Sequence, residues 1–192
     1  MFIYLHGFNS SGQSAKGQFF ADEFGESNVI RPSYSMDPDL AIASLSELIS
    51  TLMANSFTAS PILIGSSLGG YYAQYLAQQF KLASILINPA LRPIDTLAPY
   101  VGKQTHYYTQ QEYEFTATHL AALAKYHVPS PCSTGLPCLV LLDEADELID
   151  YRIAEQTYQA CAQIHIYPGG HHQFAHLTEA ATQITHFCEQ FM

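Results

Sequence analysis

Short aliphatic runs that end near Gly, Pro or Asn recur along the chain, and helix-length segments separate them. The runs lie at Phe2–Leu5, Asn28–Ile30, Ile62–Ile64, Ser84–Ile87, Cys138–Leu142 and Ile164–Tyr167. Apolar runs of this length are typical of strands that are buried on both faces of a parallel sheet. The alternation therefore predicts a three-layer α/β fold, with a mostly parallel sheet of about six strands between helices on both faces.

The segments between the runs have the apolar spacing of helices. In the clearest one, Asp37 and Pro38 form an N-cap and N1 pair, and apolar residues then recur every two to four positions up to Met53. Similar patterns predict helices over 68–80, 151–162 and 175–190. The chain has 192 residues, 48% of them hydrophobic, and no linker, so residues 1–192 are expected to form one domain.

One interval, Pro89 to Leu136, is longer than a single crossover helix requires. It is rich in aromatic residues and includes a predicted helix over Phe115–Tyr126. The aromatic residues are Tyr100, Tyr107, Tyr108, Tyr113 and Phe115. Two interpretations remain open: residues 89–136 form a cap or lid-like insertion over a pocket, or an extra helix with irregular ends packs on the sheet.

Charge and hydropathy restrict the partners. The formal net charge is −10, which disfavours binding to the phosphates of nucleic acids or to anionic lipid surfaces. No apolar run approaches the roughly 18 residues that span a bilayer, and Met1–Leu5 lacks the basic flank and length of a signal peptide. We therefore expect a cytoplasmic protein without nucleic-acid or membrane partners. The sequence does not predict an oligomeric state.

The four cysteines, Cys132, Cys138, Cys161 and Cys188, lack the paired CxxC spacing of a zinc site. In a cytoplasmic protein they are expected to remain reduced, as buried or loop thiols. A disulfide between Cys132 and Cys138 is the alternative.

A serine lies at one strand-to-helix transition, in Gly65-Ser66-Ser67-Leu68-Gly69-Gly70. The frame GxSxG fits only Ser67. In a nucleophile elbow, a serine in a strained turn projects above the sheet edge while small neighbours leave room around it. The preceding strand and following helix favour this interpretation over a simple turn with a capping serine. The N–H of Leu68 at the helix N-terminus would then face a developing oxyanion.

A nucleophilic serine needs a base and a group that orients the base. The run Cys138–Leu142 leads into a loop with several carboxylates, at the sheet edge where open α/β sheets place their sites. The carboxylates are Asp143, Glu144, Asp146 and Glu147, followed by Asp150. Asp146 is the preferred acid, because Asp143 and Glu144 are also consistent with solvated loop charges and Asp150 is placed to cap the next helix.

The base is expected after the last strand, in Gly169-Gly170-His171-His172. The glycines allow a sharp turn, so that a histidine can reach back toward Ser67. His172 is preferred and His171 remains the alternative. A metal site through His172 and His176 lacks the glutamate of HExxH and a third ligand, so no metal is expected.

A second oxyanion donor is expected near the N-terminus. His6-Gly7-Phe8 follows the strand Phe2–Leu5, and the N–H of Phe8 is placed to point into the site, as in HG-type loops. His6 is interpreted as a residue that braces this loop by hydrogen bonding.

Five stretches carry a family resemblance. HGFNSS at 6–11, GSSLGG at 65–70, INPALRP at 87–93, DELIDYR at 146–152 and GGHHQF at 169–174 resemble, in order and spacing, the small bacterial YqiA-like esterases of the α/β-hydrolase superfamily. The resemblance implies a reduced hydrolase fold without the N-terminal strands of larger relatives, no cofactor, and Ser67, Asp146 and His172 as nucleophile, acid and base. His171 departs from the pattern, since a small polar or acidic residue is expected there. Within INPALRP, Arg92 is expected to form a structural salt bridge or to contact an acidic substrate group.

Together these features predict a serine hydrolase that cleaves carboxylic esters with short to medium acyl chains. A thioesterase acting on acyl-CoA or acyl-carrier substrates with the same triad remains possible, although the acidic charge counts against a polyanionic substrate. A catalytically silent hydrolase fold that serves as a binding module is the alternative from another class. Fold and triad do not identify the physiological substrate.

Overall fold

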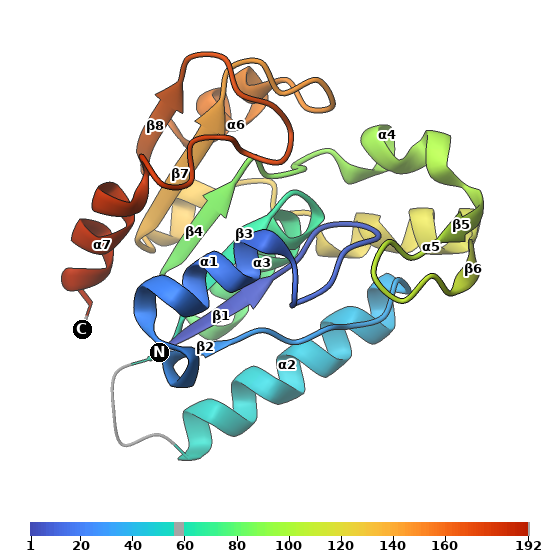
Figure 1. The fold of residues 1–192 in the computed structure, drawn as a ribbon, viewed down its shortest axis with the longest axis horizontal. Coiled ribbons are helices and arrows are strands. Elements are labelled where there is room, and N and C mark those ends of the chain that lie inside the picture. The colour runs from blue at the N-terminus through green and yellow to red at the C-terminus, as the bar shows by residue number, and fades with distance from the viewer. Residues whose placement is uncertain (56–59, 192) are drawn as a thin grey trace.

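The computed structural model describes residues 1–55 and 60–191, and a parallel sheet lies at its centre (Figure 1). Within these residues the sheet has six strands in the order β2-β1-β3-β4-β7-β8, with every neighbouring pair parallel. The strands are β1 (Phe2–Leu5), β2 (Val29–Ile30), β3 (Ile62–Ser66), β4 (Ser84–Ile87), β7 (Cys138–Asp143) and β8 (Gln163–Tyr167). The predicted fold class, a mostly parallel sheet with helices on both faces, is confirmed.

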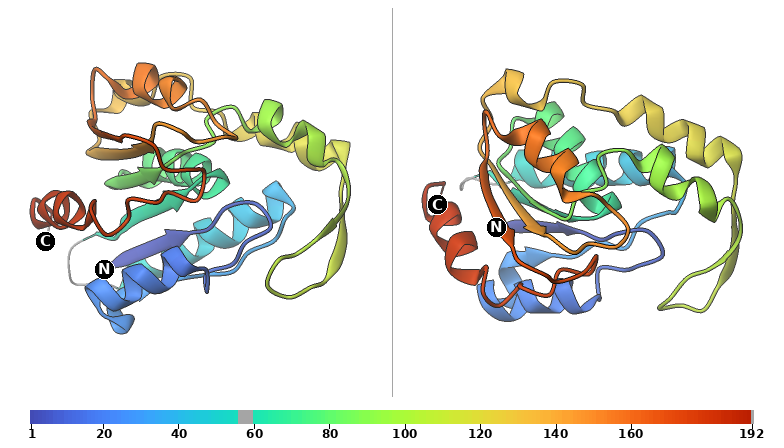
Figure 2. Two further views of the ribbon diagram at one scale, coloured as in Figure 1. Left: turned by 45° about the horizontal axis from the view of Figure 1, so that its top comes forward. Right: turned by 90° about the horizontal axis from the view of Figure 1, so that it is seen from above.

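Helices cover both faces of the sheet, as the two further views show (Figure 2). In the described part of the chain the five long helices are α1 (Ala15–Phe24), α2 (Pro38–Asn55), α3 (Leu68–Phe80), α6 (Tyr151–Tyr158) and α7 (Ala181–Glu189). Alternate side chains of the central strands β1, β3, β4 and β7 enter opposite core clusters. Ile3 of β1 packs on the side of α2, α3 and α6, whereas its neighbour Tyr4 packs on the side of α1 and α7. None of the described helices is both long and apolar enough to cross a bilayer.

Two helices are shorter than their apolar patterns predict. The helix predicted over 151–162 ends at Tyr158, where the N–H groups of Cys161 and Ala162 turn back to the Tyr158 carbonyl. The helix predicted over 175–190 begins only at Ala181, because the N–H of Ala175 donates to Asp143 and the residues up to Ala180 form turns. In both segments the apolar pattern of the sequence extends beyond the residues that are in the helix.

The segment 89–136 contains several short elements instead of one long helix. They are α4 (Pro93–Leu97), the 3₁₀ turn η2 (Ala98–Tyr100), strands β5 (Gly102–Thr105) and β6 (Glu112–Phe115), α5 (Ala117–Ala122), and the 3₁₀ turns η3 (Leu123–Tyr126) and η4 (Pro131–Thr134). A further 3₁₀ turn, η1 (Glu26–Asn28), precedes β2. The antiparallel β5–β6 hairpin lies at the right of Figure 1, away from the central sheet. The helix predicted from Phe115 starts two residues later, because Phe115 ends β6 and Thr116 caps α5.

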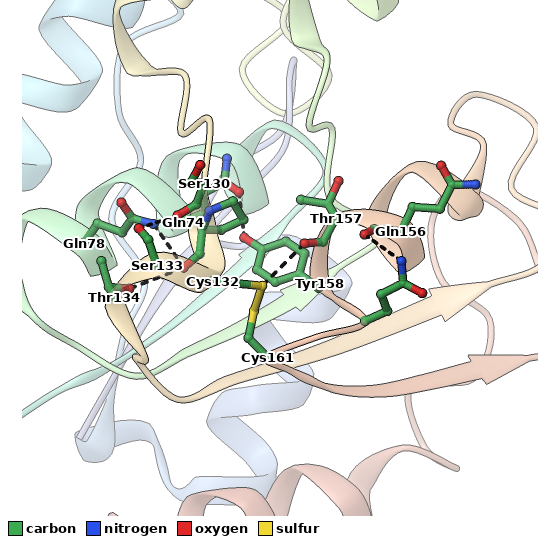
Figure 3. The surroundings of a disulfide bond; sticks show 12 residues. Gln74, Gln78, Ser130, Cys132, Ser133, Thr134, Gln156, Thr157, Tyr158 and Cys161 are labelled. Carbon is green, nitrogen blue, oxygen red and sulfur yellow. Dashed lines mark hydrogen bonds between the residues drawn. A yellow bond between two sulfur atoms is a disulfide. The ribbon is translucent and has the colours of Figure 1, made fainter.

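The expectation of four reduced thiols is wrong for two cysteines. Cys132 and Cys161 form a disulfide between η4 and the end of α6 (Figure 3). The alternative pairing of Cys132 with Cys138 is also wrong, since Cys138 and Cys188 are free and buried. The bonded cysteines are 29 positions apart in sequence, but the packing of η4 beside α6 brings their Cα atoms to 5.3 Å. Sequence spacing carries no information about this pairing.

Candidate active site

Ser67 occupies the turn between β3 and α3 in a backbone conformation that is rare for a residue with a side chain. Its φ is 56° and its ψ is −121°. Such strain persists only where the surroundings enforce it, and it is common at functional turns. Glycines make the turn possible: a Cβ on Gly65 would lie 2.3 Å from the carbonyl oxygen of Gly69, and one on Gly69 would lie 2.1 Å from that of Leu5. The GxSxG frame therefore forms a nucleophile-elbow geometry.

His172 and Asp146 continue from Ser67 in one chain of hydrogen bonds. The ring atom Nε2 of His172 lies 2.9 Å from Ser67 Oγ, and its Nδ1 lies 2.9 Å and 3.0 Å from the two carboxylate oxygens of Asp146. Because a carboxylate accepts, Nδ1 carries the proton and Nε2 is left to accept from the serine hydroxyl. The structure thus brings together the three side chains that the sequence singled out.

The loop after β7 fixes the Asp146 carboxylate. The N–H groups of Leu148 and Ile149 both donate to Asp146 Oδ1 at 2.9 Å, and the Asp146 side chain is 1% exposed. The neighbouring Asp150 caps α6 by accepting from the N–H of Arg152, as expected. A carboxylate held in this way keeps the imidazole in one orientation and one tautomer.

The two adjacent histidines have different surroundings. The side chain of His172 is 17% exposed and lies against Ser67, whereas His171 is exposed and its ring forms no hydrogen bond with the residues that the structure describes. Only the main chain of His171 is held, through its N–H and carbonyl. Of the two histidines, His172 is the one whose ring lies against the Ser67 hydroxyl.

Two segments that carry expected oxyanion donors adjoin Ser67. Leu68 is the first residue of α3, and a Cβ on Gly7 would lie 3.6 Å from Ser67 Oγ, which places the loop of Gly7 and Phe8 next to the hydroxyl. Among residues 1–55 and 60–191, the N–H groups of Phe8 and Leu68 donate to no other backbone group. Free N–H groups in this position can stabilise an oxyanion.

His6 is buried behind this loop and contacts Tyr34. The two rings stack with centroids 4.0 Å apart, His6 Nδ1 lies 2.9 Å from the carbonyl oxygen of Gly7, and the hydroxyl of Tyr34 donates to the His6 carbonyl. Burial lowers the pKa of His6 to about 4, so its imidazole is neutral at neutral pH. These contacts are those of a residue that holds the loop in place.

Arg92 does not form the salt bridge that the sequence suggested as one of its two roles. It is exposed and has no carboxylate partner within the described part of the chain. Its side chain lines a cavity of about 270 Å³ together with Gln74, His127 and Gln156, and also a smaller one of about 150 Å³ beside Leu148. Leu148 is one of the residues that hold Asp146, so the smaller cavity adjoins the acid loop.

Sequence reasoning missed the residues that hold the His172 loop. From its sequence position Asp143 is consistent with a solvated loop charge, but it is fully buried and contacts the segment 171–176. Asn88, within the INPALRP stretch, donates to the carbonyl of His171. No three His, Cys, Asp or Glu side chains among the described residues are grouped so as to hold a metal ion.

The comparisons with known proteins agree with this architecture. Residues 1–189 match the family described as "Uncharacterised protein family (UPF0227)". The chain belongs to the UPF0227 family. UPF0227 protein VP0969 of Vibrio parahaemolyticus is 26% identical over 151 residues, 78% of each chain, and a UPF0227 protein of Shewanella woodyi is 31% identical over 108 residues, 56% of this chain and 60% of that one.

Solved structures of this UPF0227 member's fold include proteins named as esterases. Est1E from Butyrivibrio proteoclasticus has a TM-score of 0.78 at 15% identity and covers 98% of this chain and 86% of its own. The Pyrococcus furiosus esterase PF2001 has a TM-score of 0.75 at 16% identity, over 99% of this chain and 81% of its own. At these identities the likeness shows a shared α/β-hydrolase fold, and the chemistry must be argued from the site itself.

Proposed function

We propose that this UPF0227 protein is a serine hydrolase that cleaves carboxylic esters through an acyl-enzyme on Ser67. The observation that carries the proposal is the unbroken hydrogen-bond chain from Ser67 Oγ through His172 to Asp146. A hydroxyl that donates to a correctly oriented imidazole is the arrangement that makes serine nucleophilic at neutral pH. The names of Est1E and PF2001 as esterases favour the same class of reaction.

In the acylation step, Ser67 Oγ attacks the ester carbonyl carbon while its proton moves to His172 Nε2. The carbonyl π-electrons move to oxygen, and the resulting oxyanion accepts hydrogen bonds from the N–H groups of Phe8 and Leu68. Collapse of this intermediate breaks the bond to the alcohol oxygen, which takes the proton from His172. Asp146 stabilises the imidazolium throughout and does not itself take the proton.

Deacylation repeats the sequence with water. His172 Nε2 accepts a proton from a water molecule, whose oxygen attacks the acyl carbon of the ester on Ser67. The second tetrahedral intermediate then releases the carboxylic acid, and the proton on His172 returns to Ser67 Oγ. No group beyond these side chains and backbone donors has to enter the cycle.

We further propose that residues 1–192 form one domain in which the segment 89–136 caps the acyl-binding region. Tyr100 and Phe115 of this segment contact the ring of Phe8, with centroids 5.7 Å and 5.0 Å away. The hairpin is also tied to the same loop, since Tyr113 donates through its hydroxyl to Asn9 Oδ1 at 2.6 Å. Aromatic side chains next to a proposed oxyanion donor favour apolar acyl groups of short to medium length.

Activity measurements on matched substrates test the proposal. The panel consists of 4-nitrophenyl esters from acetate to dodecanoate and thioesters of the same acyl groups, assayed with the wild-type protein, Ser67→Ala and Ser66→Ala. We expect oxygen esters of short to medium chain length to be cleaved by wild type and Ser66→Ala, and activity to be lost in Ser67→Ala. Faster cleavage of the thioesters would support a thioesterase. No cleavage of either class would support a silent binding module.

A further inference from the structure

The turn that carries His172 is wrapped around a second carboxylate, that of Asp143. Asp143 is the last residue of β7 and is fully buried. Its Oδ2 accepts from the N–H groups of His171 at 3.1 Å and Ala175 at 2.6 Å, and its Oδ1 lies 2.7 Å from Nδ1 of His176. Three donors from one turn, on both sides of His172, therefore converge on this carboxylate.

The main chain passes so close to Asp143 that only glycine fits before the histidines. A Cβ on Gly170 would lie 2.0 Å from Asp143 Oδ2, and the φ of Gly170 is 77°. Gly169 also has a positive φ, of 74°. Adjacent glycines leave a turn with many conformations unless other contacts select one. Asp143 supplies such contacts.

Asn88 attaches the same turn to the end of β4. Its Oδ1 accepts from the N–H of Asp143 at 2.9 Å, and its Nδ2 donates to the carbonyl oxygens of His171 and His172, both at 3.2 Å. The Asn88 side chain is buried, and its φ of 41° is one that asparagine tolerates better than most residues. One amide thus joins the strand that ends in Asp143 to the residue that faces Ser67.

Neither Asp143 nor Asn88 takes part in the proposed proton transfer between Ser67 and His172. Asp146 is the carboxylate that His172 contacts, and Asp143 contacts His176, whose ring stacks on Tyr167. Burying a carboxylate is costly unless it is hydrogen-bonded, and all three bonds to the Asp143 side chain come from the His172 turn. The ammonium of Lys16 adds a further attachment by donating to the carbonyl of Gln173 at 2.8 Å.

From these contacts we propose that Asp143 and Asn88 are positioning residues, which act through the main chain of residues 170–176 to hold the His172 imidazole at Ser67. The catalytic consequence rests on the proposed function. A misplacement of about 1 Å at a reacting group can lower the rate about 100-fold. Loosening the turn therefore lowers kcat and leaves the site that binds the substrate intact.

The test compares Asp143→Asn and Asn88→Gly with Asp22→Asn, an exposed carboxylate on α1. Asparagine keeps the size of Asp143 but places an NH₂ group among donors, and glycine tolerates the backbone of residue 88 while removing its side-chain bonds. We expect both variants to lower kcat on a 4-nitrophenyl ester by about 10-fold to 100-fold with an unchanged KM, and Asp22→Asn to match wild type. Circular dichroism establishes that each variant is folded.

A proton NMR measurement reads the same geometry without any substrate. The downfield resonance of the His172 Nδ1–H, assigned by its loss in His172→Gln, is expected to shift or broaden in Asp143→Asn and Asn88→Gly. Should Asp143→Asn fail to fold, His176→Phe takes its place. This change removes the side-chain donor to Asp143 but keeps an aromatic ring, and His186→Phe on α7 is the matched control.

Different results would overturn the positioning role of Asp143 and Asn88 and the proposed hydrolase function. An unchanged kcat and an unchanged resonance in the folded variants, or an increase in KM alone, would overturn the positioning role while leaving the proposed hydrolase intact. A wild-type protein that cleaves no ester but shows the resonance, altered in the variants, would overturn the proposed function and leave the positioning role supported.

Discussion

The ring nitrogen Nε2 of His172 lies 2.9 Å from the hydroxyl oxygen of Ser67, although 105 positions separate the two residues in the sequence. Both residues follow strands of one parallel sheet, β8 and β3, whose carboxyl ends reach the same edge. The distance therefore depends on the sheet order and on the turn that bends His172 back across β7 and β4.

The two adjacent histidines should behave very differently on substitution. His172→Gln removes the group that accepts the serine proton, and kcat for ester cleavage is expected to fall at least about 10⁴-fold. His171→Gln changes only an exposed ring, because the backbone contacts of residue 171 remain. Steady-state kinetics of both variants measures the difference. Equal losses in the two variants would contradict the assignment of the base.

Arg92 should affect the binding of ester substrates that also carry a free carboxylate. It lines two cavities, of which the smaller adjoins the acid loop, and it has no carboxylate partner in the described chain, so its guanidinium is available to an anionic group. For 4-nitrophenyl hydrogen succinate, Arg92→Gln is expected to raise KM about tenfold, the usual effect of losing a hydrogen bond to a charged group. The neutral 4-nitrophenyl methyl succinate should not distinguish the variant from wild type. Arg152→Gln, outside these cavities, is the matched control, and equal KM changes for both esters would contradict a charge-specific role.

The disulfide should contribute to stability. It closes a loop with a sequence separation of 29, and the chain-entropy relation gives a stabilisation of about 3 to 4 kcal/mol for a loop of that length. Urea unfolding of the double variant Cys132→Ser/Cys161→Ser is expected to show this decrease in the free energy of unfolding. Added reductant should destabilise wild type and leave the double variant unchanged. A wild-type curve that does not respond to reductant would argue against the bond.

His6 should make stability depend on pH. Its pKa is about 4 in the folded protein, against an ordinary value of 6.5, because burial disfavours the charged form. Between these values the unfolded chain binds the additional proton, so the free energy of unfolding decreases as the pH falls from 6.5 to about 4, by about 3 kcal/mol in total. Urea unfolding across this range is expected to give a smaller decrease in His6→Asn than in wild type. Parallel pH profiles of the two proteins would rule out His6 as the cause.

Features with a local physical cause were predictable from the sequence. The buried strands and α2 follow from apolar spacing, and the position of Ser67 follows from the only frame in which glycines flank a serine on both sides. The choice of Asp146 over its neighbours followed from its position in the loop after β7. These patterns depend on residues close together in sequence.

The remaining features depend on contacts between distant segments. Strand β5 has no apolar residue, and β6 alternates polar and apolar residues over only four positions, so neither gives a clear strand signal in the sequence. The burial of Asp143 depends on donors more than 25 positions later, and the Cys132–Cys161 pairing depends on how η4 packs beside α6. The order of residues gives no sign of such contacts before the chain is folded.

Covalent labelling tests the central claim most directly. A fluorophosphonate reacts with an activated serine, and peptide mapping by mass spectrometry identifies the residue that carries it. The account predicts a single adduct on Ser67, which is absent from Ser67→Ala, strongly slowed in His172→Gln and retained in Ser66→Ala. A wild-type protein that takes up no label, or a label that persists in Ser67→Ala, would contradict it.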